Sequence, residues 1–334
     1  MYFNIDNRDK KYIEELRDFV ERNYGVKVRT MAEHNRGWYG ETWRVECDGR
    51  DPIFLKIIYF EKQAARRYQK CFPVLDYMRE RGIDFVSQVV HTKDGAPFAI
   101  FKGGTLGAFE FIEGFNLFGQ AASAIDEDPT LLVPMMVKIY ELPLPDFKVD
   151  REEYTSCFAE LKDQVAQLKT SHAEAHAIIK ANWELLEWAH KQERHFAKMC
   201  KSKQSKLVIT SGDVGGNTLR KPDGSLAIID WDYIKLSTPE RDFWWYVQDL
   251  KQIDDINAAM AANGYDYKMD MDIIAFYAAH SFIYFLTETL DCLMFNPKAN
   301  AEVMKRLRDH LSKDWYLYKS LANAVKAAGK SADL

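Results

Sequence analysis

The sequence of 334 residues lacks several features that would assign a protein to a class at once. It contains neither a Walker motif nor a GxGxxG motif, so the common glycine-rich signatures for nucleotide phosphates are missing. The formal net charge of -5 does not provide the basic surface of a nucleic-acid-binding protein. The cysteines are odd in number and none forms a CxxC pair, which favours reduced thiols over a disulfide framework. They are Cys47, Cys71, Cys157, Cys200 and Cys292.

Long hydrophobic runs and targeting segments are also absent. The N-terminus is charged and has no apolar signal core. The longest mostly apolar stretch, 275–286, contains His280 and is too short to span a bilayer. There is no internal repeat, low-complexity linker or long heptad run. We therefore expect a cytoplasmic protein, a monomer or homodimer, that binds neither membranes nor nucleic acid.

The pattern of apolar residues divides the chain into two unlike parts. Residues 8–24 and 62–81 have helical spacing and end at Gly25 and Gly82. Short strand-like runs separated by turn residues cover 26–31, 42–47, 53–59, 85–91 and 97–101. From about residue 129 the pattern is helical, most clearly in 151–200, 271–291 and 300–328, except for an expected hairpin over 207–230. The sequence predicts an α+β protein in which a small antiparallel sheet, residues 1–108, precedes a larger helical part.

The predicted hairpin places acidic residues at the ends of two short strands. Asp213 follows the strand 207–210, Asn217 lies four residues later, and Asp230 ends the strand 226–229. A carboxylate such as Asp213 can orient a hydroxyl and accept its proton, while Asn217 and Asp230 are oxygen ligands suited to Mg²⁺. Alone, each segment reads as an ordinary turn. Together they favour phosphoryl transfer, whose catalysis consists mostly of positioning and charge neutralisation.

A lysine inside an apolar strand supports the same interpretation. Lys56 lies within 53–58, where an amine is costly to bury unless it meets an anion. Nucleotide phosphates would provide that anion; the alternative is a lysine at a sheet edge that extends into water. The preceding loop contains Gly37 and Gly40 between two strands, as expected of a flap over phosphates.

Other polar residues near these motifs are less specific. Asp232 either binds a second metal ion or caps its turn, and Asp242 is expected to brace the loop of Asp213 by hydrogen bonds. His172 and His176 are four residues apart but have no evident third metal ligand, which favours a solvated helix face.

The order of a strand lysine, G-D-x-x-x-N, I-D-W-D and a later R-D resembles the aminoglycoside phosphotransferase and choline kinase superfamily. Residues 229–232 and 239–242 are most similar to its spectinomycin phosphotransferase branch. The resemblance covers 26–250 and, more weakly, the helical C-terminus. It implies a two-lobed protein-kinase-like fold with an N-terminal lobe over 1–108, a hinge over 109–114 and a helical C-terminal lobe over 115–334. The C-terminal lobe would hold a catalytic hairpin at 207–232 and an acceptor pocket built from 115–200 and 243–300.

The same resemblance implies a role for each site residue. Asp213 corresponds to the catalytic base, and Lys56 to the lysine on the α- and β-phosphates. Magnesium ligands would be Asn217 and Asp230, with Asp232 as a further candidate. The hinge residues whose backbone meets the nucleotide base would be Glu110, Phe111 and Ile112.

The sequence departs from the family pattern in three places. Ser211 replaces the usual His two residues before the base. The loop between base and Asn is one residue shorter than the commonest form, and we expect the unusual conformations open to Gly215 and Gly216 to compensate. The Glu that pairs with the lysine is not evident, because Gln69 lies near that position and Glu61 comes too early.

These residues lead us to expect an enzyme that uses ATP or GTP and Mg²⁺ to phosphorylate a hydroxyl of a small molecule. An aminoglycoside or aminocyclitol antibiotic is the favoured acceptor, which would make the protein a resistance enzyme. Acidic residues at Glu240, Asp249, Asp254 and Asp255 would attract its positive charge. The alternatives are a kinase of a metabolite of the choline, homoserine, methylthio-sugar or fructosamine type, and a catalytically dead pseudokinase.

Overall fold

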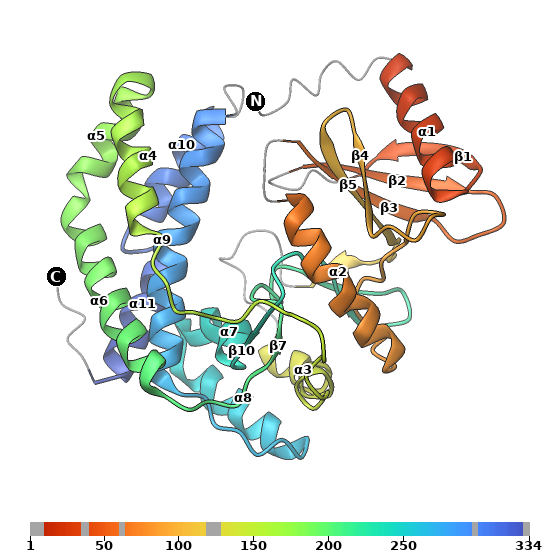
Figure 1. The fold of residues 1–334 in the computed structure, drawn as a ribbon. Coiled ribbons are helices and arrows are strands. Elements are labelled where there is room, and N and C mark those ends of the chain that lie inside the picture. Colours follow the sequence, from red (N-terminus) through yellow and green to blue (C-terminus); the bar gives the residue numbers. More distant parts are fainter. Residues whose placement is uncertain (1–9, 35–39, 60–63, 118–127, 296–299, 330–334) are drawn as a thin grey trace.

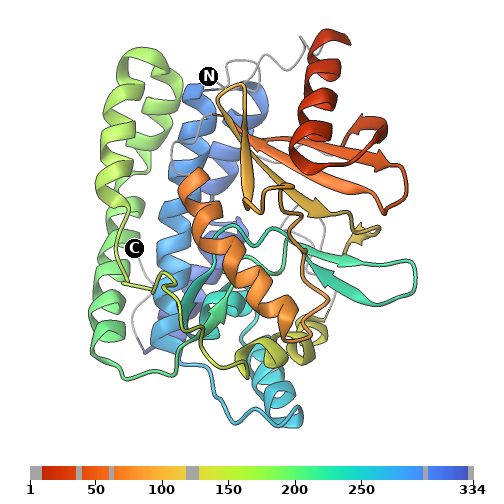
Figure 2. The same ribbon diagram turned by 45° about the vertical axis from the view of Figure 1, so that its right-hand side comes forward.

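The computed structural model describes residues 10–34, 40–59, 64–117, 128–295 and 300–329. A strand-rich part from the first third of the chain lies beside a larger helical part (Figure 1). The helix α2 lies between the two parts in both ribbon views (Figure 2). The expected α+β, two-lobed arrangement is confirmed.

The N-terminal lobe is a five-stranded antiparallel sheet with one helix before it and one inserted. Its strands run in the order β1-β2-β3-β5-β4. The elements are α1 (Lys10–Tyr24), β1 (Val28–Glu33), β2 (Glu41–Cys47), β3 (Ile53–Ile58), α2 (Ala64–Glu80), β4 (Phe98–Phe101) and β5 (Gly104–Glu110).

The alternation of side chains along β3 decides where its lysine points. Ile53, Leu55 and Ile57 are fully buried in a core that also contains Leu16 of α1. Successive side chains of a strand point to opposite faces, so Lys56 belongs to the other face of the sheet. Because β3 pairs with both β2 and β5, it is a central strand, and the alternative of a sheet-edge lysine is wrong.

Two sequence-based strand predictions in this lobe need correction. The run 85–91 forms only isolated bridges, from Val86 to Ile228 and from Val89 to Phe109, and no regular strand. The strand β5 was not predicted, because its glycines are poor strand formers. A Cβ at Gly107 would lie 2.7 Å from the ring of Tyr68, so glycine lets α2 pack closely on this strand.

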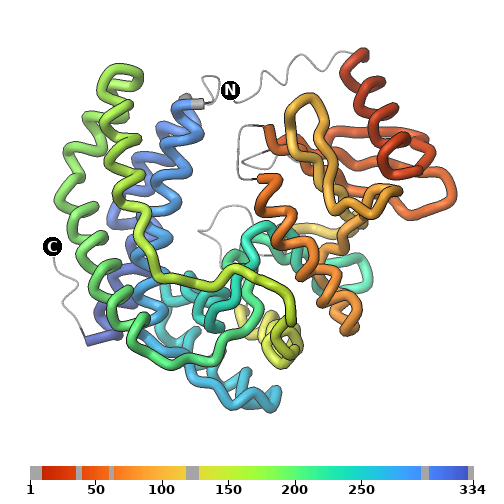
Figure 3. The backbone as a smooth tube through the Cα atoms, viewed as in Figure 1, coloured from red at the N-terminus to blue at the C-terminus, as the bar shows by residue number. Residues whose placement is uncertain are grey.

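The C-terminal lobe is built mainly from helices around α9. The described helices are α3 (Val133–Tyr140), α4 (Phe158–Ser171), α5 (Ala173–Ala181), α6 (Trp183–Ser202), α7 (Glu240–Phe243), α8 (Leu250–Ala262), α9 (Met271–Phe295), α10 (Asn300–His310) and α11 (Tyr316–Ala327), with 3₁₀ turns η2 (Pro129–Leu132) and η3 (Trp244–Gln248). After α3 the chain runs across to α4, α5 and α6, as Figure 3 traces. Against α9 pack α6, α11, α4 and α10.

The apolar segment around His280 is longer than its sequence suggested. Within the described residues, Met271–Met294 of α9 is long and apolar enough to cross a membrane by length and composition alone. However, 78% of its most apolar stretch is buried inside the protein. This helix is the central core element of the lobe.

The expected hairpin over 207–232 is wrong in its pairing. Strand β7 (Val208–Thr210) pairs with β10 (Lys235–Ser237), whereas β8 (Thr218–Arg220) pairs with β9 (Leu226–Ile228). The tight turn that makes a hairpin is Lys221–Ser225, where the Lys221 N–H donates to the Ser225 carbonyl at 2.8 Å. On its other side β8 pairs with β6 (Phe115–Asn116), the strand that follows the sheet of the N-terminal lobe.

Candidate active site

The loop that carries Asp213 begins where β7 ends and is held by α7. The Gly212 N–H donates to Oδ1 of Asp242 at 2.6 Å, so the predicted bracing contact exists. The second oxygen of Asp242 accepts from the Tyr140 hydroxyl at 2.9 Å. Arg241 donates to the Thr210 carbonyl at 3.1 Å from the adjacent position. In the family pattern a His at the position of Ser211 supports this loop. Here the residues of α7 support it instead.

Two glycines in this loop are required for different reasons. Gly212 has φ of +90°, and a Cβ there would lie 2.5 Å from Arg241 Nη2. A Cβ at Gly215 would lie 1.1 Å from Cζ2 of Trp245, so the indole occupies the space of a side chain. Neither Gly215 nor Gly216 has a positive φ. The expectation that unusual backbone conformations close the shorter loop is therefore wrong; Gly215 is there to admit Trp245.

Hydrogen bonds join the Asp213 loop to the strand that leads to Asp230. Asn217 donates from Nδ2 to the Asp213 carbonyl at 2.8 Å and closes the loop on itself. The Ile229 N–H donates to the Asn217 carbonyl at 2.9 Å. Asp230 follows with φ of +60°, a backbone conformation that is uncommon outside glycine and often marks a functional position. The two acidic segments are thus neighbours, as the sequence predicted.

Lys56 reaches this segment from the other lobe. Its Nζ lies 2.6 Å from Asp230 Oδ1 and 2.7 Å from Asp232 Oδ2. Burial opposes the charge of the amine, but the carboxylates of Asp230 and Asp232 outweigh it and hold the pKa of Lys56 well above its usual value. The partners of Lys56 are therefore Asp230 and Asp232 of the I-D-W-D motif, and not a Glu on α2.

The helix α2 nevertheless contributes a residue at this point. Gln69 is exposed, and Glu61 lies outside the described residues. Tyr68 is fully buried, and burial raises its pKa well above the usual value, with a further contribution from the charge of Asp232. Its hydroxyl has no hydrogen-bond partner within the described residues. The sequence did not single it out, since an aromatic residue on a helix usually belongs to the core.

The pKa of Asp213 responds to the charge of Asp230. Asp213 is exposed to solvent, yet protein atoms crowd around it. This crowding, the charge of Asp230 and the charge of Glu288 raise the pKa of Asp213 to about 7. A carboxylate with a pKa near neutrality is suited to accept a proton from a hydroxyl. Asp230 links the other two groups at the junction of the lobes, because it pairs with Lys56 and its charge acts on Asp213.

Sequence reasoning missed the residues of α9 that border Asp213. Glu288 and Tyr284 are one helical turn apart, and the Tyr284 hydroxyl is hydrogen-bonded to both Glu288 and Tyr233. The Tyr233 hydroxyl accepts from Arg67 of α2 at 2.5 Å. This network crosses from one lobe to the other beside the candidate base. Its sequence signal was an acid spaced by four residues from a Tyr in the apolar middle of a long helix.

The acids proposed to attract a cationic acceptor are placed differently. Glu240 is buried and accepts from the Tyr267 hydroxyl at 2.9 Å and from the Asp270 N–H at 2.7 Å. Asp249 caps α8 by accepting from the Lys251 N–H at 2.9 Å. Asp255 pairs with Lys251 on the same helix, and Asp254 is exposed there. The first two have structural roles, and Glu288 is the acid that borders Asp213.

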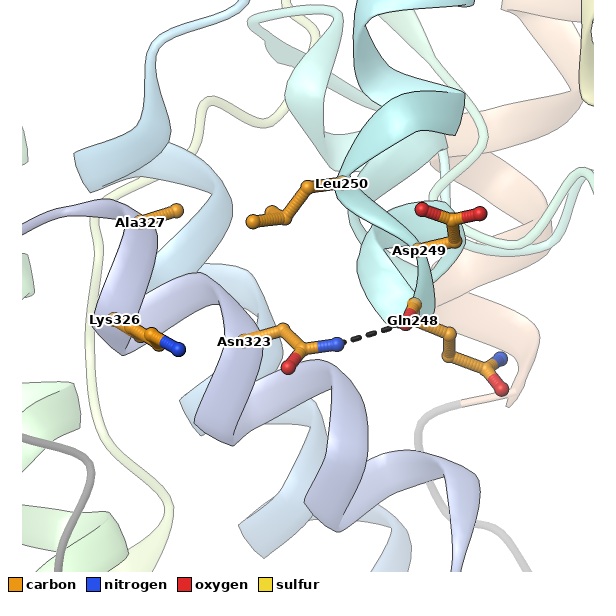
Figure 4. Close-up of a pocket in the computed structure, with 6 residues that line it drawn as sticks. All are labelled: Gln248, Asp249, Leu250, Asn323, Lys326 and Ala327. Carbon is orange, nitrogen blue, oxygen red and sulfur yellow. Dashed lines mark hydrogen bonds between the residues drawn. The ribbon is translucent and has the colours of Figure 1, made fainter.

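Of the residues singled out from the sequence, only Asp249 lines a hollow of about 490 Å³ (Figure 4). It lies between the start of α8 and the end of α11, where Asn323 Nδ2 donates to the Gln248 carbonyl at 2.7 Å. Its lining residues are Gln248, Asp249, Leu250, Asn323, Lys326 and Ala327. We do not assign the chemistry to this hollow.

The residues expected to meet the nucleotide base lie at the end of β5 and in the segment that follows it. Glu110 ends β5, and its side chain pairs with Arg79 at 3.0 Å. The Phe111 N–H donates to the Pro52 carbonyl at 3.0 Å, and Ile112 follows before β6. Gly37 lies outside the described residues. A Cβ at Gly40 would lie 2.7 Å from the Ile57 carbonyl oxygen, so glycine is needed there for contact with β3.

The donor set at the junction fits a magnesium ion. Asp230 is exposed, and its charge raises the pKa of Asp213. The negative charges of these two carboxylates therefore act on the same region of the lobe junction. Asn217 uses its amide nitrogen within the loop, which leaves Oδ1 as its ligand atom. Mg²⁺ accepts such oxygen ligands and keeps several waters. Asp232 is 2% exposed and bound to Lys56, so its assignment as a metal ligand stays a prediction.

Comparison with solved structures identifies the architecture. A spectinomycin phosphotransferase in complex with ADP and spectinomycin superposes with a TM-score of 0.68 at 17% identity, over 93% of this chain and 98% of that one. The chain has the fold of the small-molecule phosphotransferases. A microcompartment-associated aminopropanol kinase gives 0.60 at 15% identity, over 97% and 100% of the two chains. A choline kinase from Streptococcus pneumoniae gives 0.54 at 15% identity, over 90% and 99%.

No family model matches the sequence, and no curated protein is detectably similar to it in sequence. The phosphotransferase fold is therefore recognised through structure, in agreement with the resemblance noted from the motifs.

Proposed function

We propose that this protein is a cytoplasmic kinase that transfers the γ-phosphoryl group of ATP or GTP to a hydroxyl of a small molecule. The observation that carries the proposal is the pairing of Lys56 with Asp230 and Asp232 across the lobe junction, where the charge of Asp230 also acts on Asp213. Solved structures with the same fold are named as kinases or phosphotransferases and were determined with ADP, AMP or AMP-PNP and Ca²⁺.

Each residue has a task that follows from its charge and position. Lys56, freed from Asp230 as the nucleotide enters, would hold the phosphates through its amine. Asp213 would orient the acceptor hydroxyl and take its proton as the phosphoryl group moves. Mg²⁺ bound to Asn217 and Asp230 would supply charge neutralisation between the transferred and leaving phosphates.

We further propose that the acceptor carries an amine, with an aminoglycoside or aminocyclitol antibiotic as the favoured class. Asp213, Asp230 and Glu288 concentrate negative charge at the junction, which favours a cation. The spectinomycin and amicoumacin named in related structures support this class. The competing class is a metabolic amino alcohol, supported by the choline and aminopropanol kinases with the same fold.

A thermal-shift assay with ATP, with and without Mg²⁺, tests the nucleotide site. We expect Mg²⁺-dependent stabilisation of the native protein by ATP that disappears in Asp230→Ala and persists in Asp254→Ala, an exposed acid on α8. ATP that stabilises neither protein, with or without Mg²⁺, would contradict the proposal. Stabilisation without turnover of any acceptor would instead indicate a pseudokinase.

A coupled assay of nucleotide turnover then identifies the acceptor. Spectinomycin, other aminocyclitols, choline and simple amino alcohols are compared, with Asp213→Asn as the inactive control. Turnover with an antibiotic alone would support a role as a resistance enzyme. Turnover with amino alcohols alone would instead support a role as a metabolic kinase.

A further inference from the structure

A buried carboxylate in the helical lobe has no place in the phosphotransfer site. Glu193 of α6 is fully buried. Within the described residues no lysine or arginine forms an ion pair with it. Its oxygens contact Nδ1 of His280 at 2.9 Å, Nδ1 of His190 at 3.1 Å and the Ser156 hydroxyl. Removing a carboxylate from water requires compensation by hydrogen bonds and by positive charge, and a bound cation would supply that charge.

A thiol completes a set of metal ligands around this carboxylate. Ligand atoms of Cys157, Glu193 and His280 all lie within 4.8 Å of one another. In a tetrahedral zinc site with bonds of about 2.0–2.3 Å, neighbouring ligand atoms are about 3.3–3.6 Å apart. Small side-chain movements therefore suffice to bring the three atoms onto one ion.

The three ligands come from different elements and are backed by other side chains. Cys157 immediately precedes α4, Glu193 lies in α6 and His280 in α9. His190 stacks on Phe158 with ring centroids 4.1 Å apart, which fixes the imidazole that contacts the second oxygen of Glu193. A hydrogen-bonded partner behind a ligating carboxylate is a usual feature of metal sites.

We propose that Cys157, Glu193 and His280 bind one divalent ion of the zinc class, with a water molecule as fourth ligand. Thiolate, imidazole and carboxylate together are the donors that zinc takes in proteins. Binding displaces the proton of the Cys157 thiol, which leaves to solvent. The ion would fasten α4, α6 and α9 together and is separate from the magnesium ligands of the phosphotransfer site.

Titration of the full-length, chelator-treated protein with Co²⁺ tests this site, because Co²⁺ replaces zinc and is coloured. We expect one equivalent to produce ligand-field bands in the visible and a thiolate charge-transfer band in the near ultraviolet. Zn²⁺ should abolish both bands and raise the melting temperature of the protein.

Matched variants locate the binding. Cys157→Ser should remove the charge-transfer band and weaken Co²⁺ binding at least tenfold, whereas Cys200→Ser, at a buried thiol of α6, should leave both unchanged. His280→Gln should weaken binding similarly, with His195→Gln, at an exposed position of α6, as its control. Far-ultraviolet circular dichroism confirms that each variant is folded.

Two results would overturn the proposal. One is the lack of a thiolate band in the folded native protein. The other is equal loss of the band in Cys157→Ser and Cys200→Ser. Either result would make Glu193 the centre of a hydrogen-bonded network without metal, and the proposed phosphotransfer activity would be unaffected.

Discussion

Replacing Gly215 by alanine should disturb the Asp213 loop by a steric clash while leaving every polar side chain of the loop in place. The new methyl group would lie 1.1 Å from Cζ2 of Trp245, a distance that no pair of carbon atoms tolerates. Either the indole rotates away or the loop moves. The neighbouring Gly216 provides the control, since a Cβ there meets only Asp213 Oδ1 at 3.7 Å, an ordinary contact.

The size of the effect follows from the packing. Overfilling a packed site costs about 1–3 kcal/mol of unfolding free energy, a loss that lowers Tm by a few degrees. Displacement of catalytic groups by about 1 Å can cost about 100-fold in rate. Because Asn217 and Asp213 flank the altered position, we expect kcat to fall by about that factor in Gly215→Ala. Gly216→Ala should leave both stability and kcat close to native.

The assays are equilibrium denaturation and kcat with the acceptor found by the turnover screen. Trp245→Phe removes part of the indole, so the double variant Gly215→Ala/Trp245→Phe should be more stable than the sum of the single changes predicts. Equal effects of Gly215→Ala and Gly216→Ala on stability and kcat would refute the packing argument. So would additivity in the double variant.

Other predictions concern single side chains around the same junction. Burial raises the pKa of Asp242 to about 6, above the usual value near 3.8, so the folded protein holds its proton more tightly than the unfolded chain does. The contribution of Asp242 to the free energy of unfolding should be greatest below about pH 4 and fall by roughly 3 kcal/mol as the pH rises through 6. Chemical denaturation of Asp242→Asn across this pH range should lack that fall. An equal pH dependence in the native protein and the variant would contradict the prediction. Tyr68→Phe removes a buried hydroxyl that has no hydrogen-bond partner among the described residues, so chemical denaturation should show no loss of stability. A loss above about 1 kcal/mol would mean that the hydroxyl is bonded in solution. Glu288→Gln should raise the KM for an amine-bearing acceptor by about 10–100-fold and leave the KM for nucleotide unchanged. Steady-state kinetics with both substrates varied checks this, and a change in the KM for nucleotide would contradict it.

The fold was predictable where local patterns are strong. Short strand-like runs between turn residues predicted β2 and β3, and helical periodicity predicted α1, α2 and most C-terminal helices. Strand β5 escaped prediction because its glycines remove the usual strand signal, although they are needed where Tyr68 packs on the sheet. The pairing of β7 with β10 was also missed, because a turn sequence indicates a hairpin only for the strands beside it.

Local sequence patterns specify the chemical groups of the junction: a lysine in an apolar strand, an Asp and an Asn four residues apart, and a second acidic turn. These residues are specified by local spacing, so a reader of the sequence can find them. Which of these groups come into contact depends on the packing of the folded chain. It paired Lys56 with Asp230 and Asp232, placed Glu288 beside Asp213, and gave Gly215 its reason in the ring of Trp245. Contacts between residues 30 to 176 positions apart depend on how whole lobes pack, and no local pattern in a single sequence records that.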